Sequence, residues 1–475
     1  MDTKLTGKTR IESDLIGARE IPAEALYGVQ TLRGIENFSI SKFRLSEYPL
    51  FIKGLAITKM AAAMANFELG LLTVEQKDAI IAACGEILDG KHHDQFPVDM
   101  IQGGAGTTTN MNANEVIANR ALELMEHERG EYQYCSPNDH VNCSQSTNDA
   151  YPTAIHIGMY FKHLQLLPHL EELIASFRKK GEEFSQIIKM GRTQLEDAVP
   201  MTLGQTFNGF ASILQDEIAH LNEAAADFLV VNMGATAIGT GICAEPGYAE
   251  KCIAALREIT GWDIRLSSDL VGATSDTSCL VGYASAMKRV CVKMNKICND
   301  LRLLASGPRC GLGEFNLPAM QPGSSIMPGK VNPVIPEVVN QICYRIIGND
   351  LTVTFAAEAG QLQLNVMEPV MVHAIFSSIK MLQKGMDRLR ILCVEGITAN
   401  TQHCREMVLN SIGIVTALNP TLGYENSSRI AKRALKENRS VYDLVLEEGL
   451  LTKDELDQLL KPESMIKPHK FYKKK

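Results

Sequence analysis

Apolar residues recur at helical spacing over long stretches of the chain from about residue 149 onward. In one stretch they follow one another three or four residues apart: Leu280, Ala284, Met287, Cys291, Met294, Cys298 and Leu301. Such spacing places them on one face of an α-helix. The same pattern predicts long helices over residues 153–190, 204–233, 275–306, 334–364 and 368–395.

Shorter helices are predicted on both sides of these segments. Residues 56–69 and 73–90 are helical in pattern, and the second segment begins with a capping box from Thr73 to Gln76. A second capping box, from Thr452 to Glu455, begins a short helix near the end of the chain. Continuous alternation of apolar and polar residues is almost absent, so the predicted fold class is all-α.

The lengths of the predicted helices also bear on assembly. Long helices with apolar residues on more than one face need cover on several sides, which favours a bundle extended by other subunits. We therefore expect a homo-oligomer. Three domains are predicted: a mainly helical N-terminal domain, a central long-helix bundle and a small C-terminal helical domain, over residues 1–143, 144–397 and 398–475.

Composition narrows the class of protein. Hydrophobic residues make up 45% of the 475 residues and charged residues 21%, as in soluble globular proteins. A net charge of -8 argues against a general nucleic-acid binder, and the Lys-rich end, 467–475, is predicted to be a solvated tail. No signal peptide and no run of about 18 apolar residues is evident, so we expect a cytoplasmic protein without a membrane partner.

The cysteines and histidines give no sign of a disulfide framework or a metal site. Twelve cysteines are scattered without CxxC pairs, and several lie at apolar positions of predicted helices, which is typical of reduced core residues. His92 and His93 are adjacent rather than at ligand spacing. We expect no cofactor and no bound metal, and divalent-cation activation stays an open alternative.

Two clusters of small polar residues precede predicted helices. The first, residues 102–115, contains Thr107, and by itself it is typical of a turn before a helix. The second, residues 142–153, contains Ser146, Thr147 and Asn148. These residues are natural helix caps, but the amides at a helix start also attract carboxylates. Both interpretations stay open from the residues alone.

Two further clusters lie in predicted breaks between long helices. Thr193 and Gln194 occupy one break, where a plain connection is the simpler interpretation. The other cluster, residues 321–341, places Ser324, Ser325, Lys330 and Asn332 among prolines and glycines. A connecting loop does not require this set of hydroxyl, ammonium and amide groups, which suit an anionic ligand.

The segment GSSIMPGKVNP, residues 323–333, resembles the signature of the aspartase/fumarase superfamily, and the likeness extends over almost the whole chain. The resemblance implies three helical domains and a homotetramer whose long helices form a twenty-helix core. It also implies that each active site collects residues from three subunits.

Within the superfamily the chain is most similar to aspartate ammonia-lyases, which implies reversible conversion of L-aspartate to fumarate and ammonia. By this resemblance Ser324 is the base that removes the Cβ proton. The implied ligands of the β-carboxylate are Thr107, Ser146, Thr147 and Ser325. Those of the α-carboxylate are Thr193, Lys330 and Asn332, and Asn148 and Gln194 lie near the amino group, where Thr107 can also contribute.

Several alternatives stay open. Class II fumarases typically have GRTH and SSND where this chain has GRTQ, residues 191–194, and STND, residues 146–149, and they usually carry a His where this chain has Ser136. Loss of hydroxide requires an acid, whereas an ammonium group leaves as neutral ammonia, so Gln194 favours ammonia loss. Less favoured are a non-catalytic structural relative, such as a lens crystallin, and a helical binding module for protein or nucleic acid.

Overall fold

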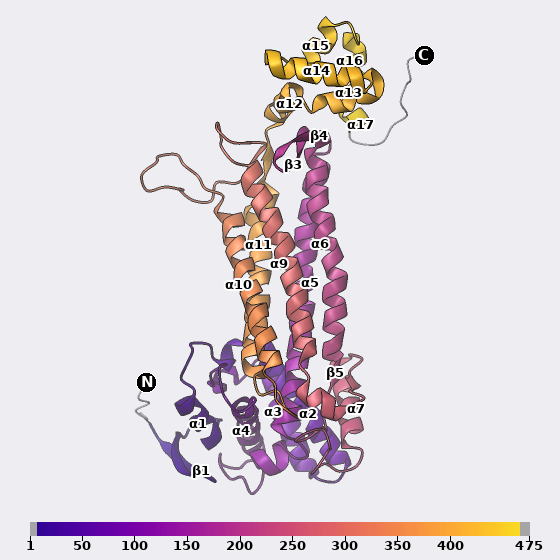
Figure 1. The fold of residues 1–475 in the computed structure, drawn as a ribbon. Coiled ribbons are helices and arrows are strands. Elements are labelled where there is room, and N and C mark those ends of the chain that lie inside the picture. The colour runs from indigo at the N-terminus through magenta and orange to yellow at the C-terminus, as the bar shows by residue number, and fades with distance from the viewer. Residues whose placement is uncertain (1–6, 466–475) are drawn as a thin grey trace. The chain divides into compact units, whose positions relative to one another are not determined.

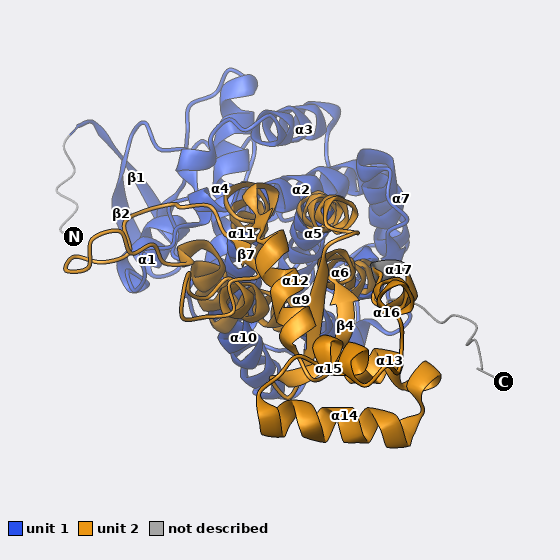
Figure 2. Ribbon diagram, turned by 90° about the horizontal axis from the view of Figure 1, so that it is seen from above, with its two compact units in different colours: residues 1–167, 219–289, 345–381 blue, residues 168–218, 290–344, 382–475 orange. Residues whose placement is uncertain are grey.

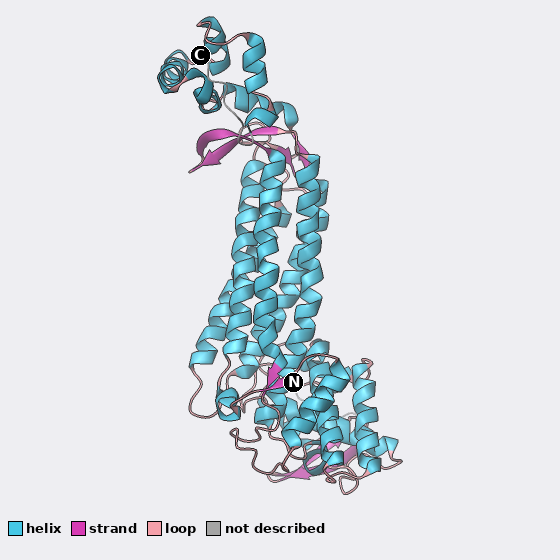
Figure 3. Ribbon diagram, turned by 90° about the vertical axis from the view of Figure 1, so that its right-hand side faces the viewer, coloured by secondary structure: helices cyan, strands magenta, loops and turns pink. Residues whose placement is uncertain are grey.

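The computed structural model describes residues 7–465, and within that range strands occur only in four two-stranded sheets (Figures 1 and 3). The predicted all-α class is therefore confirmed. The Lys-rich end at 467–475 lies outside the described residues. The chain divides into two compact units (Figure 2). Unit 1 comprises residues 1–167, 219–289 and 345–381, and unit 2 comprises residues 168–218, 290–344 and 382–475.

All of the predicted long helices are present. They are α5 (Thr147–Glu183), α6 (Leu203–Ala226), α9 (Ser278–Leu304), α10 (Val334–Glu358) and α11 (Glu368–Leu392). The boundaries between the two units fall inside these helices, so each helix contributes a segment to each unit. The division of the sequence into three domains stays a prediction.

The predicted helix boundaries need correction. The first long helix begins at Thr147 rather than at 153, and it ends at Glu183 rather than at 190. Residues Ile188–Thr193 form strand β3 instead, which pairs antiparallel with β4 (Glu196–Thr202). Apolar periodicity does not distinguish a short buried strand from one more helical turn, which explains the error. The helix predicted over 334–364 ends at Glu358.

Unit 1 is built around α2 (Pro49–Glu68), which packs against α3 (Val74–Leu88) and α7 (Tyr248–Thr260). The capping box at Thr73 is confirmed. By length and composition α2 is apolar enough to span a membrane, with a mean hydropathy of 1.3, but 72% of this window is buried inside the protein. It is therefore the core helix of this unit. The remaining elements are β1 (Thr9–Asp14), β2 (Gly17–Pro22), α1 (Val29–Asn37), η1 (Leu45–Glu47), η2 (His93–Gln95), α4 (Thr107–Leu124), η3 (Pro137–Val141), η4 (Asp227–Leu229), β5 (Val230–Val231), β6 (Arg265–Leu266) and α8 (Leu270–Ser275).

Unit 2 joins the β3–β4 hairpin to the C-terminal helices. Ile188 and Met190 of β3 lie in one buried cluster with Val408, Ile414 and Leu418. The second capping box, from Thr452 to Glu455, is confirmed. The further elements are β7 (Phe315–Asn316), η5 (Val394–Gly396), β8 (Thr398–Ala399), α12 (Thr401–Asn410), α13 (Ile414–Leu422), α14 (Tyr424–Glu437), α15 (Val441–Glu447), α16 (Lys453–Leu459) and α17 (Pro462–Met465).

Candidate active site

In unit 1, the first turns of α4 and α5 lie beside each other. Thr107 is the first residue of α4 and Thr147 the first residue of α5. One turn into α4, the side-chain amide of Asn110 donates a hydrogen bond to Thr147 Oγ1 at 3.2 Å. Backbone N–H groups at the start of a helix have no partner within the helix and attract anions. Two such helix starts therefore meet at this place.

Gly106 makes the close approach of the two helices possible. It caps α4 with a φ of +86°, in the left-handed region that favours glycine. A Cβ atom at this position would lie 2.5 Å from the ring of Tyr151 on α5. Gly106 thus sets the position of Thr107 relative to α5.

The turn Ser146–Asp149 is fixed from both sides. Ser146 Oγ accepts a hydrogen bond from the backbone N–H of Asn148 at 3.2 Å, and Asp149 Oδ1 accepts one from the N–H of Ser146 at 3.0 Å. The other oxygen of buried Asp149 accepts from the N–H groups of Gly234 and Thr236. These residues therefore do cap a helix, and the cap is also anchored to a second loop.

Lys59 of α2 lies fully buried beneath this turn. Its ammonium group donates to Asn142 Oδ1 at 3.0 Å and to Gln145 Oε1 at 2.8 Å. The same Asn142 oxygen accepts from the Asn110 amide at 3.1 Å, which connects Lys59 to the group that holds Thr147. Burial lowers the pKa of Lys59 to about 7, although the nearby charge of Asp149 acts in the opposite direction.

In unit 2, Thr193 and Gln194 lie at the tip of the β3–β4 hairpin. Gln194 and Leu195 have φ values of +55° and +68°, and the flanking Thr193 and Glu196 are paired. Positive φ at both central residues is typical of a two-residue hairpin turn. The break predicted between two helices is therefore a hairpin.

A buried carboxylate holds β3 in place. Glu314 accepts from Arg192 Nη1 at 2.5 Å, and its other oxygen lies 2.8 Å from Lys189 Nζ. Both cations lie on β3, and Arg192 directly precedes Thr193. The ion pairs thus orient the strand that ends at the hairpin tip.

The loop with the signature sequence is closed at its base. Pro322 and Val331 form an isolated bridge, and the N–H of Gly323 donates to the carbonyl of Lys330 at 2.7 Å. The Asn332 side chain donates to the Gly323 carbonyl at 2.8 Å. Asn332 therefore has a structural contact in addition to any ligand contact.

Ser324 is held by the backbone of this same loop. Its hydroxyl oxygen accepts hydrogen bonds from the N–H groups of Ile326 and Met327, at 3.2 and 2.9 Å. Donors at this oxygen favour its deprotonated form. Ser325 and Lys330 are exposed, and the apolar side chain of Ile326 is 84% exposed.

The predicted site residues thus form two groups. Thr107, Ser146, Thr147 and Asn148 come together in unit 1. The other group belongs to unit 2, in the hairpin and the signature loop: Thr193, Gln194, Ser324, Ser325, Lys330 and Asn332.

The comparison with protein families assigns most of the chain. Residues 17–348 match the family model described as Lyase, and residues 414–467 match the model described as the fumarase C C-terminus. The chain belongs to the lyase family. The superfamily prediction made from the signature segment is therefore confirmed, and the protein is an enzyme of the lyase class.

Curated relatives of this lyase share more than half of its residues. The aspartate ammonia-lyase of Pseudomonas canavaninivorans is 58% identical over 97% of each chain. That of Helicobacter pylori strain 26695 is 56% identical over 98% of this chain and 100% of the relative. That of Escherichia coli K12 is 54% identical over 98% of this chain and 97% of the relative.

Solved structures resemble the lyase over almost its whole length. A fumarate lyase:delta crystallin from Brucella melitensis, bound to cobalt, has a TM-score of 0.95 and 52% identity, and covers 97% of this chain and 100% of its own. A class II fumarase from Schistosoma mansoni has a TM-score of 0.90 and 34% identity, with coverages of 98% and 100%. Among residues 7–465 of this lyase, no group of three or more His, Cys, Asp or Glu side chains could hold a metal ion.

Several residues of the lyase that support its site were not predicted from the sequence. Asn110 and Asn142 lie in the polar clusters 102–115 and 142–153, but the sequence does not distinguish them from their neighbours. Glu314 lies outside those clusters, and no local pattern distinguishes it. Lys59 gave a usable signal, because it is a charged residue within the apolar run of 54–65. A lysine at such a position is almost never fully buried unless it has polar partners.

Proposed function

We propose that this lyase converts L-aspartate reversibly to fumarate and ammonia. The proposal rests on the full-length relatives that are named aspartate ammonia-lyase and on Ser324 as the base. The observation that carries it is the pair of backbone N–H groups directed at Ser324 Oγ. An ordinary serine hydroxyl is a poor base, and donors placed at its oxygen stabilise the alkoxide that must form.

The reaction as proposed moves protons and breaks one carbon–nitrogen bond. Ser324 takes a proton from Cβ, and the electrons move into the β-carboxylate, which becomes an enediolate-like dianion. The C–N bond then breaks, the carbon–carbon double bond of fumarate forms, and the amino group leaves as neutral ammonia. Fixed donors are needed where the second negative charge develops, and each contributes on the order of 10²–10³ in rate.

The two groups of residues suit the two carboxylates of aspartate. The β-carboxylate would bind at the starts of α4 and α5, with hydroxyls from Thr107, Ser146 and Thr147 and a further hydroxyl from Ser325. The α-carboxylate would bind Thr193, Lys330 and Asn332, where one ammonium group supplies the charge. The amides of Asn148 and Gln194 would contact the amino group, and Thr107 is a further candidate for that contact.

We further propose a homotetramer with shared sites and a twenty-helix core. α5 starts at Thr147 and continues unbroken for 37 residues, which is roughly 55 Å of helix. The two ends of one helix are too far apart to touch a single substrate molecule. In addition, α10 exposes Tyr344, Leu351 and Phe355 along one line, at 56%, 53% and 60% exposure. Such an apolar line is typical of an interface between copies.

The substrate test compares two acids at equal concentration. L-aspartate is expected to give fumarate, followed by its ultraviolet absorbance, and L-malate is expected to give little or none. Faster fumarate formation from malate would identify a class II fumarase. No fumarate from either acid would favour a structural relative.

The proposed reaction includes no cofactor step. We also propose that the lyase is cytoplasmic. Twelve free cysteines fit a reducing compartment. Dialysis against a chelator is expected to leave the rate with aspartate unchanged. Adding Mg²⁺ back then measures any divalent-cation activation.

A further inference from the structure

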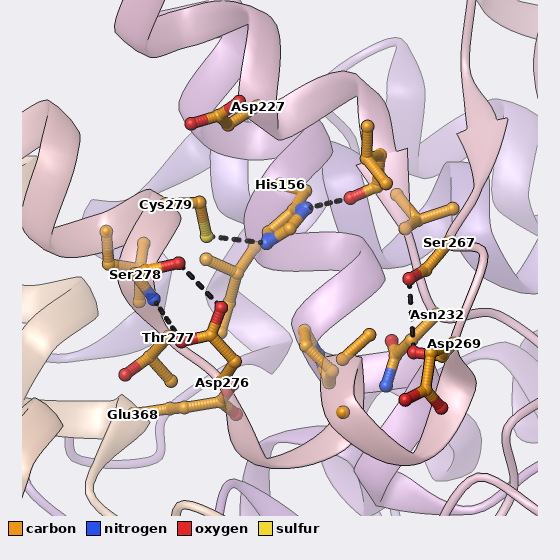
Figure 4. A pocket seen from close by; sticks show the side chains of 17 residues that line it. His156, Asp227, Asn232, Ser267, Asp269, Asp276, Thr277, Ser278, Cys279 and Glu368 are labelled. Atoms are coloured by element: carbon orange, nitrogen blue, oxygen red, sulfur yellow. Dashed lines mark hydrogen bonds between the residues drawn. The ribbon is translucent and has the colours of Figure 1, made fainter.

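A pocket of about 440 Å³ lies in unit 1, between the first part of α5 and the starts of α9 and α11 (Figure 4). Its volume is within the range of small-molecule sites. Four carboxyl groups line it, and among the described residues that line it none is a Lys or Arg. The acidic residues are Asp227, Asp269, Asp276 and Glu368.

Glu368 is the unusual member of this set. It is only 8% exposed, and no hydrogen bond or ion pair to its carboxyl occurs within the described part of the chain. Figure 4 shows its side chain extending from the start of α11 into the pocket. Burial raises the pKa of Glu368 to about 8. A buried carboxyl without a partner is costly, and buried charges are normally paired.

The inner wall of the pocket carries a neutral imidazole rather than a cation. His156 Nδ1 lies 2.9 Å from the Val230 carbonyl, so this nitrogen carries the proton and donates. Its Nε2 is then an acceptor and lies 3.2 Å from Cys279 Sγ. Burial lowers the pKa of His156 to about 4 and raises the pKa of the Cys279 thiol, so both groups are neutral at pH 7.

We propose that this pocket binds a protonated aliphatic amine, with Glu368 as the counter-charge of its ammonium group. An ammonium group donates hydrogen bonds to carboxylate oxygens, which the pocket presents on four side chains. A metal ion is disfavoured, because no group of three potential ligands exists among the described residues. The volume exceeds that of an ammonium ion, and the acidic residues at the exposed side, Asp227, Asp269 and Asp276, suit a second ammonium group of a diamine.

The pocket also adjoins the proposed active site. Asn232 lines it, and the side-chain amide of Asn232 donates to the backbone carbonyl of Asn148 at 3.0 Å. An amine bound in the pocket would therefore contact Asn232, which holds the turn that contains Asn148. The inference does not depend on aspartate turnover, because amine binding is measured without the reaction.

The test is calorimetric titration of the whole protein at pH 7. The probes are 1,4-diaminobutane and ammonium chloride, each compared with sodium chloride at equal ionic strength. We expect one saturable site per chain for the diamine, with weaker binding of ammonium. Because Glu368 is mostly protonated at pH 7 and must ionise to pair with the amine, the heat should change with the ionisation enthalpy of the buffer. The other titratable groups facing it are His156, Asp227, Asp269, Asp276 and Cys279.

Glu368→Gln keeps the shape of the side chain and removes its charge. This variant should bind the diamine roughly 10- to 100-fold more weakly, and its binding heat should no longer depend on the buffer. Glu258→Gln, an exposed position on α7, is the matched control and should bind like the wild type. Circular dichroism of each variant confirms that it is folded.

Three results would overturn the proposal. One is the absence of saturable binding of either amine to the wild type. Another is equal binding by wild type and Glu368→Gln. The third is a change of subunit assembly in Glu368→Gln, measured by sedimentation, without amine binding to the wild type, which would mean that a second copy of the chain supplies the partner of this carboxyl.

Discussion

The loop backbone surrounds the Ser324 hydroxyl with hydrogen-bond donors, which an ordinary exposed serine lacks. Two N–H groups are directed at its oxygen, and the bridge between Pro322 and Val331 closes the loop that holds them. No His or carboxylate lies in the signature segment to take over proton removal. Our proposal therefore has the serine act as the base by itself and not as part of a dyad.

Replacing Ser324 with alanine should nearly abolish turnover and leave the fold intact. Loss of a general base typically costs roughly 10²–10⁴ in rate, and the upper end is expected here. The loop carries little core packing, so the unfolding midpoint should hardly move. Initial rates with aspartate and thermal melts measure both quantities. Ser13→Ala, at an exposed position, is the control, and a near-normal rate in Ser324→Ala would assign the base to another residue.

Lys330→Ala should mainly weaken the binding of dicarboxylates. One charge-assisted hydrogen bond to the α-carboxylate is worth roughly 1.5–3 kcal/mol. Calorimetry with a non-reacting dicarboxylate measures the loss, with exposed Lys453→Ala as the comparison. Unchanged affinity would show that Lys330 does not contact the ligand.

Lys59 is expected to make stability depend on pH. Its pKa is lowered to about 7 in the folded protein from the ordinary value of 10.5, so between these values the unfolded chain binds more protons. The contribution of Lys59 to the free energy of unfolding therefore rises with pH across this window. Urea denaturation at pH 7 and pH 9 should show a larger increase for wild type than for Lys59→Met. Equal increases would mean that Lys59 does not titrate in this range.

At the scale of elements, the site in unit 1 depends on how α4 and α5 meet. The meeting is set by a glycine cap on one helix and an aromatic side chain on the other, and by the Asn110 amide between them. The hydroxyls of Thr107 and Thr147 are therefore positioned by helix packing rather than by contacts with each other.

Gly106→Ala should disturb this packing and lower activity. A left-handed conformation costs a non-glycine residue roughly 1–2 kcal/mol, and the added methyl would also overlap the Tyr151 ring. We expect a lower melting temperature together with a lower kcat/KM for aspartate. Gly85→Ala is the matched control, since nothing lies within 4 Å of its added Cβ. It should be neutral or stabilising by up to about 1 kcal/mol. Full activity in Gly106→Ala would show that the start of α4 tolerates displacement.

At the scale of the whole molecule, our proposal builds each active site from more than one copy of the chain. The first residue of α5 belongs to one proposed carboxylate site, and the hairpin that follows α5 belongs to the other. If the long helices of two subunits pack antiparallel, the start of α5 in one subunit would lie near the hairpin of the other, as closed symmetric oligomers allow.

Two inactive variants should therefore restore activity when mixed. Thr147→Arg and Ser324→Ala are unfolded together and refolded as mixed oligomers. Some sites then contain an intact Thr147 from one subunit and an intact Ser324 from another, and these should turn over aspartate. Each variant refolded alone is the control. Mixed oligomers that form and stay inactive would mean that each subunit builds its own site.

The sequence by itself determined the features that depend on local order. Helical periodicity placed all five long helices, both capping boxes were recognised from residues three apart, and the signature segment identified the family. These signals are local because a helix closes its hydrogen bonds four residues apart. The same clusters supplied every candidate residue of the site, whose assigned roles stay predictions.

Only the tertiary structure decided what depends on distant partners. Residues 188–202 form a hairpin because Ile188 and Met190 pack on helices more than 200 residues later, which periodicity within one segment does not reveal. Lys59 holds the Asn142 oxygen across 83 positions, and Glu368 lines a pocket built from α5, α9 and α11 without a partner among residues 7–465. Burial and partners are properties of packed elements, so these groups acquired their chemistry only when the chain folded.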